Sequence, residues 1–193
     1  MRVIEGRKRP QRILAPPKSV RKHPWALHPP LHASLFIDAA LADELDASAK
    51  ESRARGTEAL GLLLGDALSA PGSGARYTVA LSRATSQVQA TSTHVRFDPA
   101  GFEAIARSLE AQAFDYLIVG WYHTHLGLGC FMSETDVRTQ GRYFGLPHQF
   151  ALVIDPIRQE AAVFSRSADT GKGLPFAVFE NGRAGNSDFR KPR

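Results

Sequence analysis

The chain has 193 residues, of which 43% are hydrophobic and 22% charged, a composition typical of one folded domain and incompatible with general disorder. No apolar run approaches the ~20 residues of a membrane helix. A single cysteine, Cys130, excludes an internal disulfide framework and a multi-cysteine zinc finger. The basic amino terminus lacks the apolar segment of a secretory signal. We therefore expect a soluble, cytoplasmic protein without a membrane partner.

The net charge of +5 is unevenly distributed along the chain. Residues 1–30 hold 8 Lys or Arg and 1 Glu, whereas residues 31–193 hold 16 basic and 18 acidic residues. Six of the 12 prolines also lie in residues 1–30, which excludes a regular helix or a central strand there. We predict an extended arm over 1–30, a domain over 31–182 and a basic tail over 183–193. The arm is either a solvated tail or a contact for nucleic acid or another acidic partner.

Hydrophobic periodicity and capping residues predict both strands and helices in the domain. Aspartate caps helices and proline is tolerated in the first turn, so Asp38 and Asp98-Pro99 mark two helix starts. In chain order, the predicted elements are a strand over 32–37, a helix over 38–52 that ends by Gly56, a strand over 58–66, a turn over 71–74, a strand over 76–88, a helix over 98–113, a strand over 115–124, a helix over 133–143, and strands over 149–154, 161–165 and 176–179. Because they do not alternate as βαβ units, they favour an α+β fold, a mixed β-sheet flanked by helices.

The chemistry-bearing residues concentrate between positions 120 and 136. His123 and His125 lie two apart at the end of a predicted strand, so both imidazoles point to the same face. Seven residues separate them from Ser133, and Asp136 follows in the first turn of a helix. His, His and Asp with an open fourth position is the pattern of catalytic zinc, whose bound water has a pKa near ~7 and becomes a nucleophile.

Other interpretations of these residues remain open on the sequence. Two histidines in a strand are often ordinary strand residues. Ser133 and Asp136 also fit a helix capping box, a role compatible with chemistry at the same side chains. Cys130 is either a soft metal ligand or a buried small residue. His94 and His148 carry no signal singly.

A metal-bound water needs a base, and Glu58 is the candidate. It stands at the rim of the predicted strand 58–66, whose leucines share its face. A poorly solvated carboxylate there has a raised pKa, as a general base requires; the alternative is a glutamate that faces water. Gly61 and Gly65 in the same strand allow another backbone or a ligand to approach closely.

These residues together resemble a known motif. His123-x-His125-x7-Ser133-x2-Asp136, with the upstream Glu58-x-x-Gly61-x-x-x-Gly65, is similar to the JAMM motif of MPN-domain metalloproteases, the Mov34/MPN/PAD-1 family. The flanks Gly-Trp-Tyr, Gly-Cys-Phe-Met, Val-Arg-Thr-Gln and Ala-Leu-Val-Ile-Asp-Pro look like those of its deubiquitinase-type members. The resemblance covers about residues 32–180 and implies the MPN fold, a cytidine-deaminase-like α+β architecture.

The resemblance also implies an activity, a cofactor and roles. The protein would be a zinc isopeptidase or peptidase acting at the C-terminus of ubiquitin or a ubiquitin-like protein, whose tail lies extended in a groove. His123, His125 and Asp136 would hold one Zn²⁺ per chain. Glu58 would transfer the protons, and Ser133 would hydrogen-bond the oxyanion. Conjugation-pathway enzymes are further candidate partners.

One residue departs from the family pattern, since Leu126 stands where proline usually follows the second histidine. We expect catalysis to persist, with an effect on loop rigidity or substrate preference. The short connections favour a compact, bacterial-type enzyme that processes or removes a ubiquitin-like modifier. The alternatives are a non-catalytic MPN scaffold in a protein complex and a nucleic-acid-associated protein that binds through its basic arm.

Overall fold

The computed structural model describes residues 20–21, 23–25, 33–69, 76–84, 117–166 and 173–180. The turn predicted over 71–74, the helix predicted over 98–113, the tail over 183–193, His94 and most of the arm lie outside the described residues. Within the described ranges, no helix is both long and apolar enough to cross a membrane.

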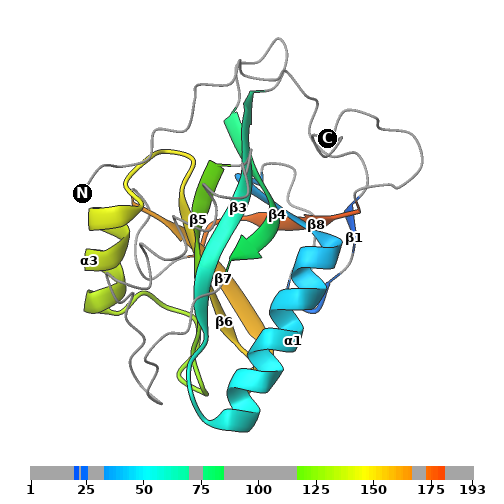
Figure 1. Ribbon diagram of the computed structural model, residues 1–193, viewed down its shortest axis with the longest axis vertical. Coiled ribbons are helices and arrows are strands. Elements are labelled where there is room, and N and C mark those ends of the chain that lie inside the picture. Colours follow the sequence, from blue (N-terminus) through cyan, green and yellow to red (C-terminus); the bar gives the residue numbers. More distant parts are fainter. Residues whose placement is uncertain are drawn as a thin grey trace.

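Eight strands of the described residues form one mixed sheet in the order β1-β8-β2-β4-β3-β5-β6-β7 (Figure 1). The strands are β1 (Val20–Arg21), β2 (Leu35–Asp38), β3 (Leu60–Ser69), β4 (Arg76–Ala84), β5 (Leu117–Thr124), β6 (Phe150–Asp155), β7 (Glu160–Ser165) and β8 (Phe176–Phe179). β2 runs parallel to β4 and β8, and β5 runs parallel to β6, while the other pairs are antiparallel. The predicted α+β class with a mixed sheet is therefore confirmed.

Strand β1 lies at an edge of the sheet, inside the segment predicted to be an extended arm. It pairs antiparallel with β8, with Val20 opposite Phe179. Nearby, Trp25 is buried in the core, and its ring contacts that of His23 with 4.6 Å between centroids. An edge position fits the exclusion of a central strand from this proline-rich segment, and residues 20–21, His23 and Trp25 thus contact the domain.

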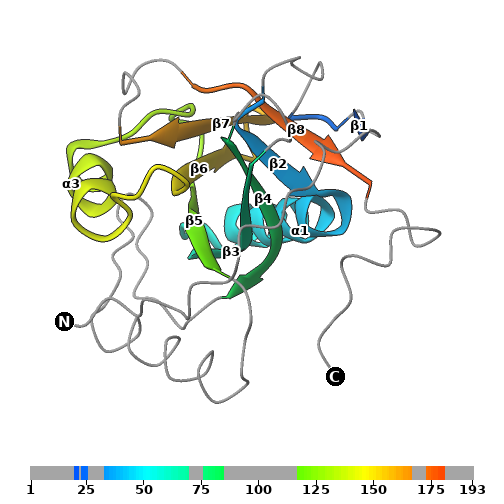
Figure 2. The same ribbon diagram turned by 90° about the horizontal axis from the view of Figure 1, so that it is seen from above.

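Helix α1 (Ala39–Arg55) covers one face of the sheet (Figure 1). The carboxylate of Asp38 accepts hydrogen bonds from the first amides, and Gly56 ends the helix in the left-handed conformation at φ 65°. Leu41 and Leu45 pack in a core cluster with residues of β2, β3 and β5. Figure 2 shows the sheet curving around this helix. The predicted start and end of the helix are confirmed.

The opposite face of the sheet carries a second core cluster and helix α3 (Glu134–Tyr143). Trp121 on β5 packs there with Leu62 on β3 and with Phe144, the residue that ends α3. Side chains alternate along a strand, so the neighbouring Tyr122 belongs instead to the cluster under α1. The two helices thus lie on opposite faces of β3 and β5, as Figure 1 shows.

Two glycines of β3 permit close contacts, as predicted. A Cβ atom on Gly65 would lie 1.8 Å from the carbonyl oxygen of Val79, and one on Gly61 would lie 2.6 Å from the ring of Tyr122. Any larger residue would push β3 away from β4 or β5.

Candidate metal centre

The two histidines lie where β5 ends. His123 is on the strand, opposite Leu60 of β3 and Val153 of β6, and His125 follows directly after it. Both side chains are buried, with 1% and 5% of their surface exposed. Paired on both sides, β5 holds the imidazoles on one face, as the alternation of strand side chains predicts.

Asp136 comes to the histidines from the first turn of α3. Its Oδ2 lies 3.5 Å from Nε2 of His123, which is 3.2 Å from Nε2 of His125. One donor atom of each of the three residues lies within 4.8 Å of the others. Donors held ~2.0–2.2 Å from a tetrahedral zinc ion are about 3.3–3.6 Å apart. The two closest separations match that spacing, so these residues fit a zinc ion.

The two imidazoles are oriented by different neighbours. The Nδ1–H of His125 donates to the carbonyl of Gly129 at 2.6 Å, and because a carbonyl only accepts, the lone pair of the neutral ring is at Nε2. The ring of His123 stacks on Trp121, with 4.7 Å between centroids and 15° between planes. Its buried Nδ1 has no hydrogen-bond partner among the described residues.

Ser133 and Asp136 form the predicted capping box of α3. The Ser133 Oγ accepts from the Asp136 amide at 3.2 Å, and Asp136 Oδ2 accepts from the Ser133 amide at 2.8 Å. Burial acts to raise the pKa of Asp136, but the His123 ring and the Ser133 donors outweigh it and lower that pKa to about 2. The carboxylate is therefore ionised at neutral pH and serves the helix and the candidate centre together.

Glu58 lies in the connection between α1 and β3, two residues before the strand begins rather than inside it as predicted. The Thr124 Oγ1 accepts from the amide of Ala59 at 2.8 Å and contacts the hydroxyl of Ser52 at the same distance, which ties the connection to the end of β5. Burial, with a smaller contribution from the Asp136 charge, raises the pKa of Glu58 to about 7. Only 6% of its surface is exposed.

The loop after His125 is held by Asp155, a residue that the sequence analysis did not single out. Asp155 is the last residue of β6 and is fully buried. Burial acts to raise its pKa, yet hydrogen bonds from four backbone amides lower it. Its amide donors are those of Gly127, Gly129, Ile157 and Arg158. An Asp-Pro pair that follows a buried strand was the available signal for such a turn.

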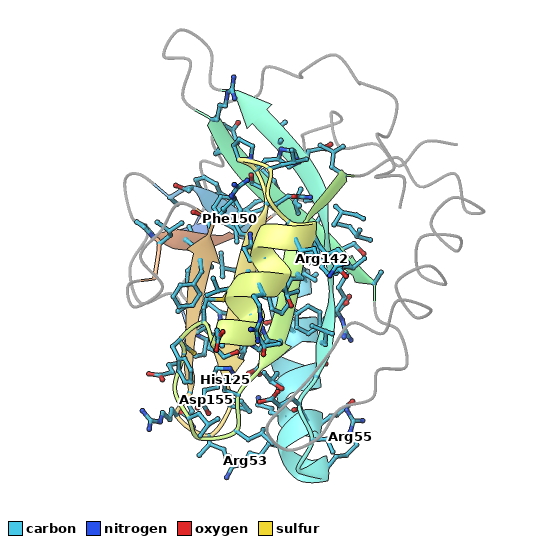
Figure 3. All side chains as sticks on the ribbon, turned by 90° about the vertical axis from the view of Figure 1, so that its left-hand side faces the viewer. Arg53, Arg55, His125, Arg142, Phe150 and Asp155 are labelled. Carbon is cyan, nitrogen blue, oxygen red and sulfur yellow. The ribbon has the colours of Figure 1, made fainter. Side chains whose placement is uncertain are left out.

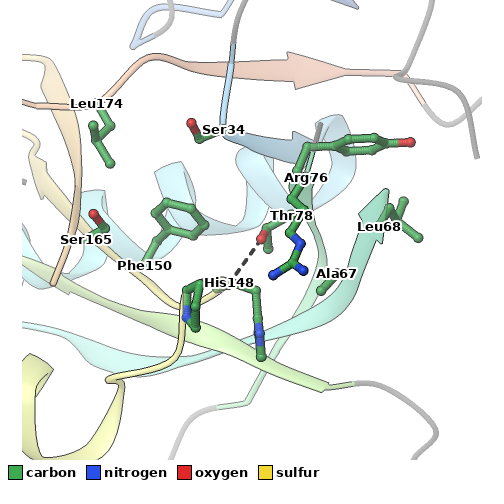
Figure 4. A pocket seen from close by; sticks show the side chains of 11 residues that line it. Ser34, Ala67, Leu68, Arg76, Thr78, His148, Phe150, Ser165 and Leu174 are labelled. Carbon is green, nitrogen blue, oxygen red and sulfur yellow. Dashed lines mark hydrogen bonds between the residues drawn. The ribbon is translucent and has the colours of Figure 1, made fainter. Parts of the chain in front are cut away.

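Two other candidates lie apart from the centre. The Cys130 Sγ lies 3.4 Å from the carbonyl oxygens of Val153 and Glu160, either of which can accept its single S–H, and burial raises its pKa to about 12, so it is a packed thiol. His148 lines a cavity of about 330 Å³ with Arg76, Phe150 and other residues (Figure 4). That cavity lies where β6 begins, at the opposite end of the strand from Asp155. Figure 3 shows His125 and Asp155 together near the C-terminal end of α1.

Comparison with protein families gives a match over this region. Residues 38–146, more than half of the chain, match the model of the JAB1/Mov34/MPN/PAD-1 ubiquitin protease family. The chain belongs to this family. The resemblance inferred from the JAMM motif is thereby confirmed, and so is the MPN fold.

Individual relatives match over shorter stretches. The 26S proteasome non-ATPase regulatory subunit 14 of Dictyostelium discoideum is 32% identical over 104 residues, which are 52% of this chain and 32% of that protein. The COP9 signalosome complex subunit 5 of Debaryomyces hansenii is 41% identical over 78 residues, 38% of this chain and 16% of that protein. The chain thus spans no more than about a third of the length of these relatives.

A solved structure agrees with the fold. The solution structure of protein DSY2949 from Desulfitobacterium hafniense superposes with a TM-score of 0.50 over 76% of this chain and 93% of that chain. The sequences are 16% identical, so the likeness concerns the fold alone.

Proposed function

We propose that this MPN protein is a zinc-dependent peptidase or isopeptidase that hydrolyses the amide bond after the C-terminus of ubiquitin or a ubiquitin-like protein. One observation carries the proposal: three buried donors, from His123, His125 and Asp136, converge beside a carboxyl group, that of Glu58, with a pKa of about 7. Membership of a ubiquitin protease family supports the substrate class.

The three donors would hold one zinc ion per chain and leave a fourth coordination position open, the arrangement of catalytic rather than structural zinc. A zinc ion bound there would act as a Lewis acid and lower the pKa of a water molecule. Asp136, ionised through its pKa of about 2, supplies the negative charge that such an ion needs. The hydrogen bond from His125 to Gly129 leaves Nε2 as the donor atom of that ring.

Glu58 would move the protons. Its carboxylate would accept a proton from the attacking water and deliver it to the nitrogen of the leaving amine. A base works best when its pKa is near the operating pH, and burial raises the pKa of this group to about 7. The hydrogen bonds that anchor the neighbouring Ala59 to Thr124 keep the carboxylate beside the centre.

Ser133 would stabilise the oxygen that becomes negatively charged during attack. Its Oγ lone pair accepts from the Asp136 amide, so the hydroxyl keeps its own hydrogen to donate to that oxygen. The capping box fixes the position of Oγ before substrate arrives. A donor that is already oriented stabilises the transition state without further reorganisation.

A protein substrate accounts for the apolar rim around the centre. Leu128, Phe131 and Ile157 expose 51%, 41% and 47% of their surface, and the ring of Phe131 lies 4.8 Å from that of His125. Large exposed apolar side chains gathered at one site are typical of a protein contact. The extended tail of the modifier would pass this rim to reach the centre.

The test combines metal analysis with cleavage. Purified protein is expected to contain about one zinc ion per chain and to cleave linear or isopeptide-linked ubiquitin or ubiquitin-like fusions, with loss of cleavage on chelation. Glu58→Gln should retain the zinc and lose cleavage by at least about 100-fold, the usual contribution of a general base. Glu134→Gln, the same change at an exposed glutamate paired with Arg138, is the matched control and should cleave normally.

Two outcomes would contradict the proposal. Cleavage by Glu58→Gln at the wild-type rate would exclude the assigned base. Native protein without zinc and without activity would favour the non-catalytic scaffold. The nucleic-acid role of the arm over 1–30 stays a separate prediction, which a salt-dependent affinity lost on deletion of residues 1–19 would support, since that deletion keeps β1 and the buried Trp25.

A further inference from the structure

The two oxygens of the Asp155 carboxylate accept different hydrogen bonds. Oδ1 accepts from the amides of Gly127, Ile157 and Arg158 at 3.1, 2.9 and 3.1 Å. Oδ2 accepts from the Gly129 amide, the shortest of the four bonds at 2.8 Å. Oδ1 therefore joins the turn after β6 to Gly127, in the loop that follows the histidines, and Oδ2 contacts the same loop at Gly129.

The Gly129 residue links this carboxylate to a donor of the candidate centre. Its amide donates to Asp155, and its carbonyl accepts the Nδ1–H of His125 at 2.6 Å. It has a positive φ of 85°, a conformation that only glycine adopts easily. Asp155, Gly129 and His125 thus form a continuous chain of hydrogen bonds that ends on the imidazole.

Apart from Asp155, few side chains of the described residues restrain this loop. Leu126 does not restrict φ as a proline would, and the side chains of Leu128 and Phe131 are exposed. Arg158 adds one bond from its Nε to the Gly127 carbonyl at 3.1 Å. Cys130 adds further contacts: its amide donates to Oε1 of Glu160 at 3.2 Å, and its thiol lies 3.4 Å from the carbonyl oxygens of Val153 and Glu160. The buried carboxylate of Asp155 is the central restraint among these contacts.

We propose that Asp155 is a positioning residue for His125, acting through the Gly129 residue to hold the ring with Nε2 toward the metal. The inference rests on the proposed zinc function and adds to it a residue outside the motif. Outer partners of metal ligands fix the tautomer and orientation of the ring, and losing one typically weakens metal binding by 10–100-fold. Here Asp155 does not bond the His125 ring directly but acts through the peptide groups of Gly129.

Asp155→Asn is the sharpest variant because it separates the two oxygens. The amide oxygen can keep the three donors at Oδ1, which leaves the NH₂ group facing the Gly129 amide, a donor against a donor. We expect zinc to bind about 10-fold or more weakly, measured by competition with a chromogenic chelator. In zinc-free protein labelled with ¹⁵N-histidine, His125 should change from one tautomer, protonated at Nδ1, to a mixture.

Two control variants separate positioning from general effects. Glu160→Gln removes a nearby negative charge but retains an acceptor for the Cys130 amide, so zinc affinity should stay within about twofold. Thr78→Val removes a part-buried hydrogen bond to the His148 carbonyl (Figure 4), in the cavity at the other end of β6 from Asp155. It should lower stability without changing the His125 tautomer. A zinc affinity and tautomer in Asp155→Asn equal to the wild type would overturn the inference.

The two proposals fail in different ways. If the wild type binds no zinc, the proposed function fails, and the tautomer in Asp155→Asn still decides whether Asp155 orients His125. If Asp155→Asn does not fold, hydrogen exchange in the wild type takes its place. The Gly129 amide should then exchange at least 100-fold more slowly than an unprotected amide, and fast exchange would contradict the bond to Asp155.

Discussion

Helices α1 and α3 begin with similar caps but are attached to the sheet by different interactions. Helix α1 buries seven residues, five of them alanine or leucine, in the apolar core. Helix α3 buries two residues, Asp136 and Gln140, and both are polar. Helix α1 is thus held by hydrophobic burial along its length, whereas α3 combines apolar packing at its end, by Tyr143 and Phe144, with hydrogen bonds of its buried polar side chains.

The polar attachment of α3 is specific. Gln140 accepts from the Trp121 Nε1–H at 2.7 Å and donates to the carbonyls of Phe144 and Gln149 at 2.8 and 3.2 Å. Since Trp121 stacks on His123, this attachment sets α3 against the same strand that carries the histidines. Stability and chemistry therefore depend on different helices, which predicts opposite effects for substitutions in the two.

The largest effect on stability is expected in α1. Leu45→Ala deletes a side chain with 0% exposure and leaves a cavity, which should lower the free energy of unfolding by about 2–5 kcal/mol. The zinc affinity of the folded protein should not change. Chemical denaturation and chelator competition measure the two quantities. Leu146→Ala, the same change at a half-exposed leucine, is the control and should cost less than about 1 kcal/mol.

The reverse result is expected in α3. In Asp136→Asn the amide oxygen can still accept from the Ser133 amide, but the interactions of the charge that lower the pKa of Asp136 to about 2 are lost, so zinc-free protein at pH 7 should lose about 2 kcal/mol. Zinc affinity should fall at least about 100-fold, because even outer partners of metal ligands contribute 10–100-fold. Chelator competition measures the affinity. Unchanged zinc binding would remove Asp136 from the centre and end the distinction between the helices.

The parts of the fold that were predicted depend on local signals. The start and end of α1 were predicted from Asp38 and Gly56, because a cap and a left-handed glycine act within a few residues. Strand β1 was missed because its two residues pair with β8, at Phe179, and no pattern within residues 20–21 marks them. Glu58 was predicted inside a strand that begins two residues later, a typical shift at the end of an element.

The residues of the candidate centre were likewise predicted where the signal is local and missed where it is not. The spacing of His123, His125 and Asp136 was sufficient to predict that these three side chains come together, because strand alternation and a helix cap are local rules. Asp155 was not found because its contact with Gly129 depends on the parallel pairing of β5 with β6, which brings distant residues together. Residues that position ligands through the backbone leave no spacing of their own in the sequence.

A smaller, pH-dependent effect on stability is expected from the buried carboxylate of Glu58. Burial raises the pKa of Glu58 from 4.5 to about 7, so the folded protein binds this proton more tightly than the unfolded chain. The stability that protonation provides is complete below pH 4.5 and is lost as the pH rises through 7. In zinc-free protein at pH 8, Glu58→Gln should therefore be more stable than the wild type by about 1–3 kcal/mol.

Urea denaturation from pH 4 to pH 8 measures this difference between Glu58→Gln and the wild type. It should be close to zero at pH 4 and grow between pH 4.5 and 7. A constant difference across the range would mean that Glu58 is solvated and has an ordinary pKa. Its role as a base tuned to neutral pH would then be wrong, although its position beside the candidate centre would stand.

The smallest effect concerns the cap of α1, which, unlike that of α3, has no part in the centre. Asp38→Ala removes the acceptor for the amides of Ala40 and Leu41 and should cost about 1 kcal/mol. Burial and the charges of Glu44 and Asp43 raise the pKa of Asp38 in spite of these bonds, so its charge is disfavoured in the folded protein. Asp38→Asn keeps the acceptor without the charge and should therefore be no less stable than the wild type at pH 7.

Thermal unfolding at constant pH distinguishes the two variants. A loss in Asp38→Asn as large as in Asp38→Ala would mean that the charge, rather than the hydrogen bond, begins this helix. Neither variant should alter zinc affinity, because the hydrogen-bond donors to Asp38 within the described part of the chain are the amides of Ala40 and Leu41 of its own helix, whereas the equivalent cap of α3 includes Asp136, a candidate metal ligand.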